Sequence, residues 1–144
     1  MNQVKIHAER LRASGLRPTE QRIAICELLF DRKETFHFTI EKLQKIAKKN
    51  INKKISLATL YNTVHAFIKN GYIKEISLKG KKTFYDTNTE NHHHFYDEDT
   101  FQLIDIKKES LSLENFPTAP KGKRIKDIEV TIRIANNYQK QKKL

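Results

Sequence analysis

The segment that most constrains the fold is residues 56–71, SLATLYNTVHAFIKNG, which carries the signals of a complete amphipathic helix. Ser56 is a favourable N-cap, because its hydroxyl can accept a backbone N–H that the first turn leaves unpaired. Gly71 is a suitable stop. Apolar side chains at helical spacing predict one buried face: Leu57, Leu60, Val64, Phe67 and Ile68. The other face would carry side chains that can contact base edges, thymine methyl groups and phosphates: Thr59, Tyr61, Asn62, His65 and Lys69.

An ordinary surface helix has the same pattern, so its neighbours decide the interpretation. Three more helices are predicted before it, over residues 2–14, from Thr19 to about residue 31, and over residues 39–50. After it, residues 72–78 and 83–86 are expected to form two strands joined by a basic turn that contains Lys81 and Lys82. Helices followed by a basic-tipped hairpin are the element order of a winged helix-turn-helix, in which a recognition helix enters the major groove.

The second half of the chain has a different character. Residues 87–91 are polar and lack periodicity, so we predict a DNA-binding domain over residues 1–88 and a second domain over residues 89–144. Strands are expected over residues 101–106 and 124–134, a loop over 109–122, and a polar tail over 136–144. The fold class is therefore α+β. A sheet this small hides its apolar face poorly alone, so a homodimer is expected.

The charge distribution supports this division. The 144 residues carry a net charge of +11, of which residues 1–88 hold +10 and residues 89–144 hold +1. A basic half favours a polyanionic partner such as double-stranded DNA. The single cysteine, Cys26, excludes an internal disulfide or a four-cysteine zinc site, and its place on a helical stripe is typical of a small buried hydrophobe. No signal peptide or long apolar run is visible, which predicts a soluble cytoplasmic protein.

Three consecutive histidines form the cluster with the clearest chemical potential. In a strand, His92 and His94 would project to one face and His93 to the other. Two imidazoles on one face are half of a site for zinc or another divalent ion, or for haem iron bound among His92, His93 and His94. Asp86, Asp105 and His37 are further candidate ligands, and a shared metal would connect the two domains. The alternative is a polar linker without a ligand.

The same segments resemble the ferric uptake regulator (Fur) superfamily. The matching motifs are LRASGLRPTEQR, SLATLYNTVHAF, NGYI and HHHFY with the LIDI strand, which together span most of the chain. The second half is most similar to the iron response regulators, Irr, of alphaproteobacteria. The resemblance implies a homodimeric repressor of iron and haem genes that responds to metal or haem. It implies base contacts by Tyr61, an A·T-rich minor-groove contact by Arg17, phosphate contacts by Gln21, Arg22, Thr59, Lys81 and Lys82, and metal ligation by His37, Asp86, His92, His94 and Asp105.

The chain also departs from the family pattern. Asn62 stands where many relatives carry arginine, and asparagine can pair bidentately with adenine. The CxxC pairs of zinc-structured relatives are missing, and a proline-containing loop replaces the helix that links strands in their dimerisation domains. Alternative functions are a regulator that senses zinc, manganese or peroxide, and a non-specific nucleic-acid-binding protein. A metallohydrolase is disfavoured, because the sequence has no HExxH motif, nucleophile elbow or glycine-rich phosphate loop.

Overall fold

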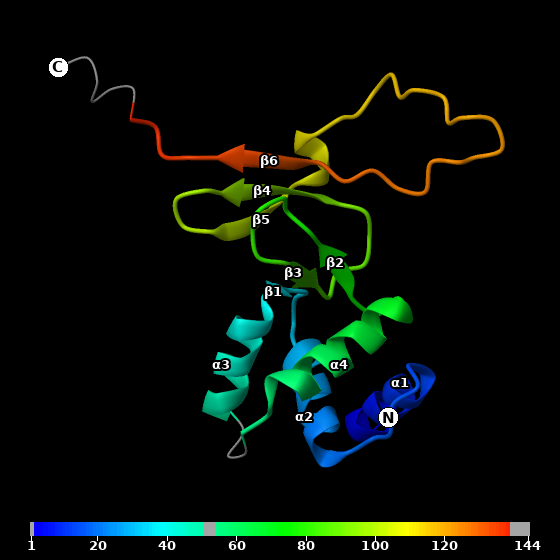
Figure 1. Ribbon diagram of the computed structural model, residues 1–144, viewed down its shortest axis with the longest axis vertical. Coiled ribbons are helices and arrows are strands. Elements are labelled where there is room, and N and C mark those ends of the chain that lie inside the picture. Colours follow the sequence, from blue (N-terminus) through cyan, green and yellow to red (C-terminus); the bar gives the residue numbers. More distant parts are fainter. Residues whose placement is uncertain (1, 51–53, 139–144) are drawn as a thin grey trace. The chain divides into compact units, whose positions relative to one another are not determined.

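A computed structural model describes residues 2–50 and 54–138. The chain separates into two compact units, residues 1–89 and 90–144. Among the described residues, helices lie in the first unit, apart from one short 3₁₀ turn, and each unit contains a three-stranded sheet (Figure 1). The α+β class predicted from the sequence is confirmed. No helix of the described residues is long and apolar enough to cross a membrane.

The first unit packs four helices with a small antiparallel sheet. The helices are α1 (Gln3–Ala13), α2 (Glu20–Phe30), α3 (Ile40–Asn50) and α4 (Leu57–Lys69). The strands are β1 (His37–Phe38), β2 (Lys74–Ile76) and β3 (Phe84–Asp86), in the order β1-β3-β2. Both predicted strands are shorter than expected, because β3 offers β2 only three paired positions. β1 was not predicted, since two residues are too few to show a period.

Side-chain caps explain where the helices begin. The hydroxyls of Thr19, Thr39 and Ser56 each accept a hydrogen bond from the backbone N–H of the residue three positions later, at 3.2 Å in all three cases. At the end of α4, Gly71 has a φ of +81°, a conformation in which glycine has no steric penalty. The Tyr72 N–H then donates to the Phe67 carbonyl at 2.9 Å.

One face of α4 faces a continuous apolar core. Leu60, Val64 and Phe67 are fully buried, and they pack with core residues of α2 and α3 that include Ile25, Leu29 and Leu43. Two residues of α4 differ from expectation. Leu57 is 44% exposed because it lies in the first turn, at the end of the buried stripe. Thr63 is buried at the i+3 position from Leu60, where its hydroxyl donates to the Thr59 carbonyl at 2.8 Å.

The second unit is a mixed sheet in the order β5-β4-β6. β4 (His93–Asp97) pairs antiparallel with β5 (Gln102–Ile106) and parallel with β6 (Thr131–Ile134), and a 3₁₀ turn (Lys108–Ser110) follows β5. The predicted strand over residues 124–134 is wrong for its first seven residues. The ladder with β4 covers only Thr131 to Ile134, and Val130 adds one backbone bond to His94 before it, so residues 124–129 have no paired strand. The predicted tail falls partly on residues 139–144, which lie outside the described residues.

Candidate functional site

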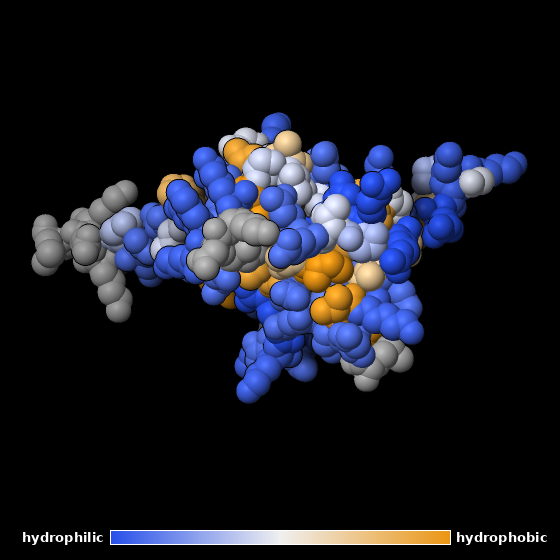
Figure 2. Space-filling view, turned by 90° about the horizontal axis from the view of Figure 1, so that it is seen from below, coloured by the Kyte–Doolittle hydropathy of each residue, from blue (hydrophilic) through white to orange (hydrophobic). Residues whose placement is uncertain are grey.

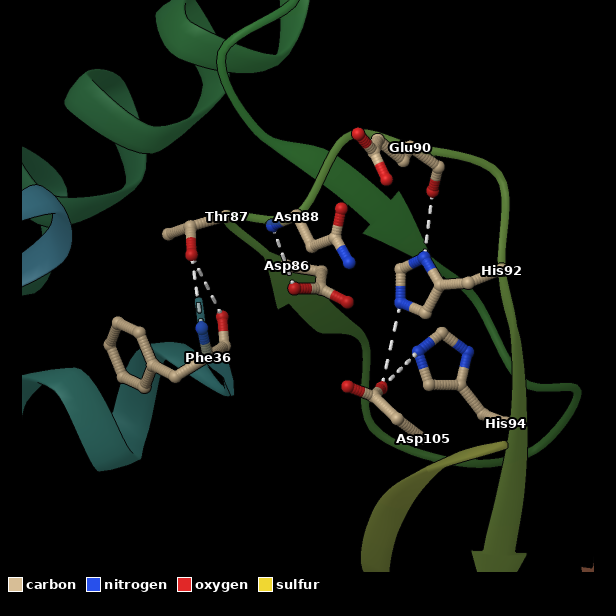
Figure 3. Close-up of polar contacts among 8 residues, drawn as sticks. All are labelled: Phe36, Asp86, Thr87, Asn88, Glu90, His92, His94 and Asp105. Carbon is tan, nitrogen blue, oxygen red and sulfur yellow. Dashed lines mark hydrogen bonds and ion pairs between the residues drawn. The ribbon is translucent and has the colours of Figure 1, made fainter. Parts of the chain in front are cut away.

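Two imidazoles of the second unit converge on one carboxylate. His94 lies on β4 directly opposite Asp105 on β5, and His92 immediately precedes β4. The Nε2 atoms of His94 and His92 lie 3.1 and 3.5 Å from the Asp105 carboxylate oxygen. Figure 3 shows both rings pointing at this carboxylate. The prediction that alternation places His92 and His94 on one side of the strand matches this geometry.

A backbone contact fixes the orientation of His92. Its Nδ1 lies 2.7 Å from the carbonyl oxygen of Glu90, and because a carbonyl can only accept, Nδ1–H is the donor (Figure 3). In the neutral ring the lone pair is then on Nε2, which faces Asp105. A lone pair aimed at a carboxylate is favourable only if a proton or a cation lies between them. Histidines that bind a metal through one ring nitrogen usually donate the other ring N–H to a carbonyl or carboxylate, as Nδ1 of His92 does to Glu90.

The distances from the Asp105 oxygen to the two imidazoles, 3.1 and 3.5 Å, are close to the separations of ligand atoms around one metal ion. Ligand atoms that share an ion with bonds of about 2.1 Å lie roughly 3.0–3.4 Å apart in octahedral or tetrahedral geometry. The potential ligand atoms of His92, His94 and Asp105 all lie within 4.8 Å of one another. His94 is buried and Asp105 is 53% exposed, so one side of the cluster is accessible to solvent. Two nitrogens and one oxygen suit zinc, iron or manganese.

The third histidine of the run does not belong to this cluster. His93 lies on the opposite side of β4, where its Nδ1 accepts the Val130 N–H at 3.0 Å. This bond fastens β4 to the residue that precedes β6. The structure therefore separates the three predicted haem candidates into a pair, His92 and His94, and a structural His93.

In the first unit, the sheet places two other predicted ligands together. His37 on β1 is the register partner of Asp86 on β3. Asp86 is buried, with 1% of its surface exposed, and its carboxylate accepts the Asn88 N–H at 2.9 Å. The pairing of β1 with β3 thus brings together residues that lie far apart in the sequence. Cys26 is unsuited to metal binding, because burial raises the pKa of its thiol to about 12.

The predicted DNA-contacting residues of α4 lie on its outer face. Tyr61 is 39% exposed and Asn62 is also exposed, whereas Leu60 and Thr63 on either side of them are buried. The ring of His65 lies 5.7 Å from that of Tyr61 in an edge-on arrangement. This contact restrains the tyrosine without covering it. Seen from below, the surface is mostly hydrophilic with several apolar areas (Figure 2).

Three predicted phosphate-contacting residues meet in one pocket. A pocket of about 390 Å³ is lined by the first turn of α2 and by α4, and it includes Gln21, Arg22 and Thr59. Arg22 donates to the Arg17 carbonyl at 3.0 Å, so the exposed Arg17 adjoins the same helix end. Lys81 and Lys82 are exposed in the β2–β3 connection, where Gly80 has a φ of +72° and the Lys81 N–H donates to the Leu78 carbonyl at 2.9 Å.

Two contributors to the sites were missed at the level of sequence. Glu90 orients His92 through its backbone carbonyl, so the identity of its side chain gave no signal. Thr63 is buried on the core side of α4, and a threonine on a helix is not an evident core residue. A polar residue at i+3 and i+4 spacing from Leu60 and Phe67 was the available indication.

Comparisons with known proteins agree with this picture. The sequence profile of the Ferric uptake regulator family matches residues 13–133. The peroxide-responsive repressor PerR of Staphylococcus aureus is 30% identical over 102 residues, which cover 71% of this chain and 67% of the repressor.

Solved structures share the fold. The ferric uptake regulator of Pseudomonas aeruginosa with manganese superposes with a TM-score of 0.65 at 18% identity, covering 91% of this chain and 98% of that one. A zinc-bound manganese uptake regulator gives a TM-score of 0.60 at 23% identity, covering 94% and 100%.

Proposed function

Because this chain belongs to the ferric uptake regulator family, we propose that it is a metal-responsive transcriptional regulator that binds operator DNA as a homodimer. Members of this family are regulators of transcription, not enzymes. The observation that carries the proposal is the His92–His94–Asp105 cluster, which begins six residues after Asp86, the last residue of the helical unit's sheet. A potential metal site thus directly follows a basic helical unit along the chain.

In this proposal the first unit is a winged helix-turn-helix domain. Helices α3 and α4 would form the helix-turn-helix, α4 would be the recognition helix, and the β2–β3 hairpin would be the wing. Tyr61 and Asn62 would contact bases in the major groove, and Arg17 would enter an A·T-rich minor groove. Gln21, Arg22 and Thr59 would hold one phosphate, since they line one pocket. Lys81 and Lys82 would contact the backbone along the wing.

The regulatory ligand in this proposal is a divalent metal ion. His92, His94 and Asp105 would hold it in the second unit. Asp86 and His37 would add ligands from the first unit: they are register partners, and six residues of chain are enough for Asp86 to reach the cluster. Ligands from both units would make the DNA-binding geometry depend on metal.

A small ion suits the cluster better than haem does. Both Nε2 atoms face one carboxylate oxygen at 3.1 and 3.5 Å, so the three side chains converge closely enough to ligate a single small ion. Control of iron and haem genes, the similarity to Irr and a haem response stay predictions. A peroxide response is a second candidate, favoured by the 30% identity to a peroxide-responsive repressor.

The proposal is tested by gel shifts on the promoter of the gene that encodes this protein and on random DNA of equal length. Each shift is run without metal, with manganese, zinc or ferrous iron, with haem, and with iron followed by peroxide. We expect tighter operator binding with one of the divalent ions. Equal binding to both DNAs under every condition would instead identify a non-specific nucleic-acid-binding protein.

Replacement of the recognition tyrosine gives a sharper test. Tyr61→Ala is expected to weaken operator binding by about 5- to 150-fold, the equivalent of about 1–3 kcal/mol for a base contact. Binding to random DNA should change little, because phosphate contacts remain. Tyr138→Ala, which removes another half-exposed tyrosine, is the matched control. An equal loss on both DNAs would argue against base recognition by Tyr61.

A further inference from the structure

The connection between β5 and β6 contains an extended arm, which we define as residues 111–128. Almost every residue from 112 to 127 is exposed, the exceptions being the half-buried Leu113 and Ala119. Large apolar side chains are among them: Phe116 is 51% exposed and Ile125 is 46% exposed. Figure 1 shows this segment leaving the sheet of the second unit and returning to it. A loop of this length without secondary structure is usually functional or disordered.

The arm has a defined reversal at its tip. The Lys123 N–H donates to the Pro120 carbonyl at 2.9 Å, and Gly122 has a φ of +80°, as the third residue of a type II turn requires. Four cations lie at or just after this turn, which makes the tip strongly basic: Lys121, Lys123, Arg124 and Lys126. The base of the arm is anchored, since the Val130 N–H donates to His93.

The same unit exposes two features that complement the arm. Phe95, Ile104 and Ile132 are register partners across all three strands, so they form one apolar face. Ile104 is 42% exposed and Ile132 is 38% exposed, which shows that the arm does not cover this face in its own chain. Three consecutive acidic residues, which we define as the acidic turn, lie at the end of β4 and in the β4–β5 turn: Asp97, Glu98 and Asp99.

We propose that the arm docks on the second unit of another copy of this chain, with its basic tip against the partner's acidic turn and its apolar residues on the partner's sheet face. The charge complementarity selects this occupant, because the tip carries four cations and the turn three acids. Among the described residues no ion pair joins the tip to the turn within one chain; the turn's own ion pair is that of Glu98 with the exposed Arg133, at 3.9 Å. In a two-fold dimer both arms make the same contact, so the interaction is made twice. This inference rests on the proposed homodimer and adds how the copies hold each other.

Charge exchange tests the docking in the full-length protein. The arm variant is Lys123→Glu with Arg124→Glu, and the turn variant is Glu98→Lys with Asp99→Lys; Asp97 is retained because its carboxylate caps the turn. Each variant alone is expected to raise the dimer dissociation constant at least tenfold in sedimentation equilibrium. An equal mixture should restore wild-type affinity as a heterodimer, because each reversed arm then meets a reversed turn. Lys107→Glu with Lys108→Glu, on the nearby 3₁₀ turn, is the matched control and should leave the dimer unchanged.

Crosslinking provides a second measurement that does not depend on the folding of the charge variants. Glu98→Cys and Lys123→Cys proteins, mixed with different tags, should form a disulfide between chains under mild oxidation, whereas the buried Cys26 should not react. A wild-type dissociation constant for the arm variant, or failure of the mixture to form heterodimers, would overturn the docking. If the arm variant stays dimeric and loses affinity for random DNA, the arm contacts DNA and the docking is wrong. Neither result affects the proposed operator binding, which the Tyr61 variant tests separately.

Discussion

Replacement of Asp105 by asparagine isolates the metal-binding role of the cluster. The side chain keeps its size but loses the charge that faces the Nε2 atoms of His92 and His94 at 3.5 and 3.1 Å. Because Asp105 is 53% exposed, its pairing with the imidazoles should contribute only about 0–1 kcal/mol to the metal-free protein. The free energy of unfolding without metal should therefore change little.

The effect of metal on stability should change much more. At a metal concentration 100 times the dissociation constant, one site stabilises the folded state by about 2.7 kcal/mol. Loss of even a supporting partner of a metal ligand typically weakens binding by about 10- to 100-fold, and a direct ligand should cost at least as much. With a 100-fold loss, the same metal concentration would give about 0.4 kcal/mol. The variant should thus lose about 2 kcal/mol of metal-dependent stabilisation, or roughly 5–10 °C in Tm.

Thermal unfolding with and without manganese or zinc measures both quantities, and calorimetric titration gives the affinity directly. Asp127→Asn, which removes another exposed carboxylate of the same unit, is the matched control and should keep the full metal response. If Asp105→Asn binds metal with wild-type affinity, the assignment of the cluster as a metal site is wrong. A large loss of stability without metal would show instead that the His–Asp contacts are structural.

Two further predictions concern the first unit. Lys81→Gln with Lys82→Gln should reduce the slope of log affinity against log salt by about 1.8 on operator and random DNA alike, because each phosphate contact contributes about 0.9. The control variant, Lys107→Gln with Lys108→Gln, should leave the slope unchanged. If the wing variant also leaves it unchanged, the wing does not contact DNA. Cys26, whose pKa burial raises to about 12, should be alkylated at pH 8 about a thousand times more slowly in the folded protein than after unfolding in urea, and comparable rates would show that α2 opens readily.

The helical half could be predicted closely because its signals are local. Thr19, Thr39 and Ser56 are N-caps that bond the backbone N–H three residues later. Gly71 ends α4 because its positive φ is open to glycine. The histidine pair was also predictable, since alternation along a strand needs only the adjacent residues. Neither prediction requires knowledge of a distant partner.

The features that sequence reasoning missed depend on distant partners. His37 and Asp86 were both expected as metal ligands, but the strand pair that makes them register partners was not, because β1 joins β3 across nearly fifty residues and its two residues carry no periodic signal. The alternation of isoleucine and valine through residues 128–134 predicted a long strand, but the ladder on β4 ends the pairing at Thr131. Leu57 is exposed for a similar reason: the spacing of apolar residues along α4 shows which face is buried, but not where along the helix the core ends.

The proposed metal response has a thermodynamic consequence, because its ligands come from both units of the chain. A metal held by His92, His94 and Asp105 alone would stabilise the second unit without altering α4. Coupling needs ligands such as Asp86 and His37, whose strands belong to the unit that carries α4. If metal raises operator affinity tenfold, a coupling of about 1.4 kcal/mol, then operator DNA must raise metal affinity by the same factor. His37→Ala should lower this coupling on both sides equally while the second-unit ligands still bind metal. Titration of metal in the presence and absence of operator measures it, and unequal factors or a coupling that His37→Ala leaves intact would contradict the shared site.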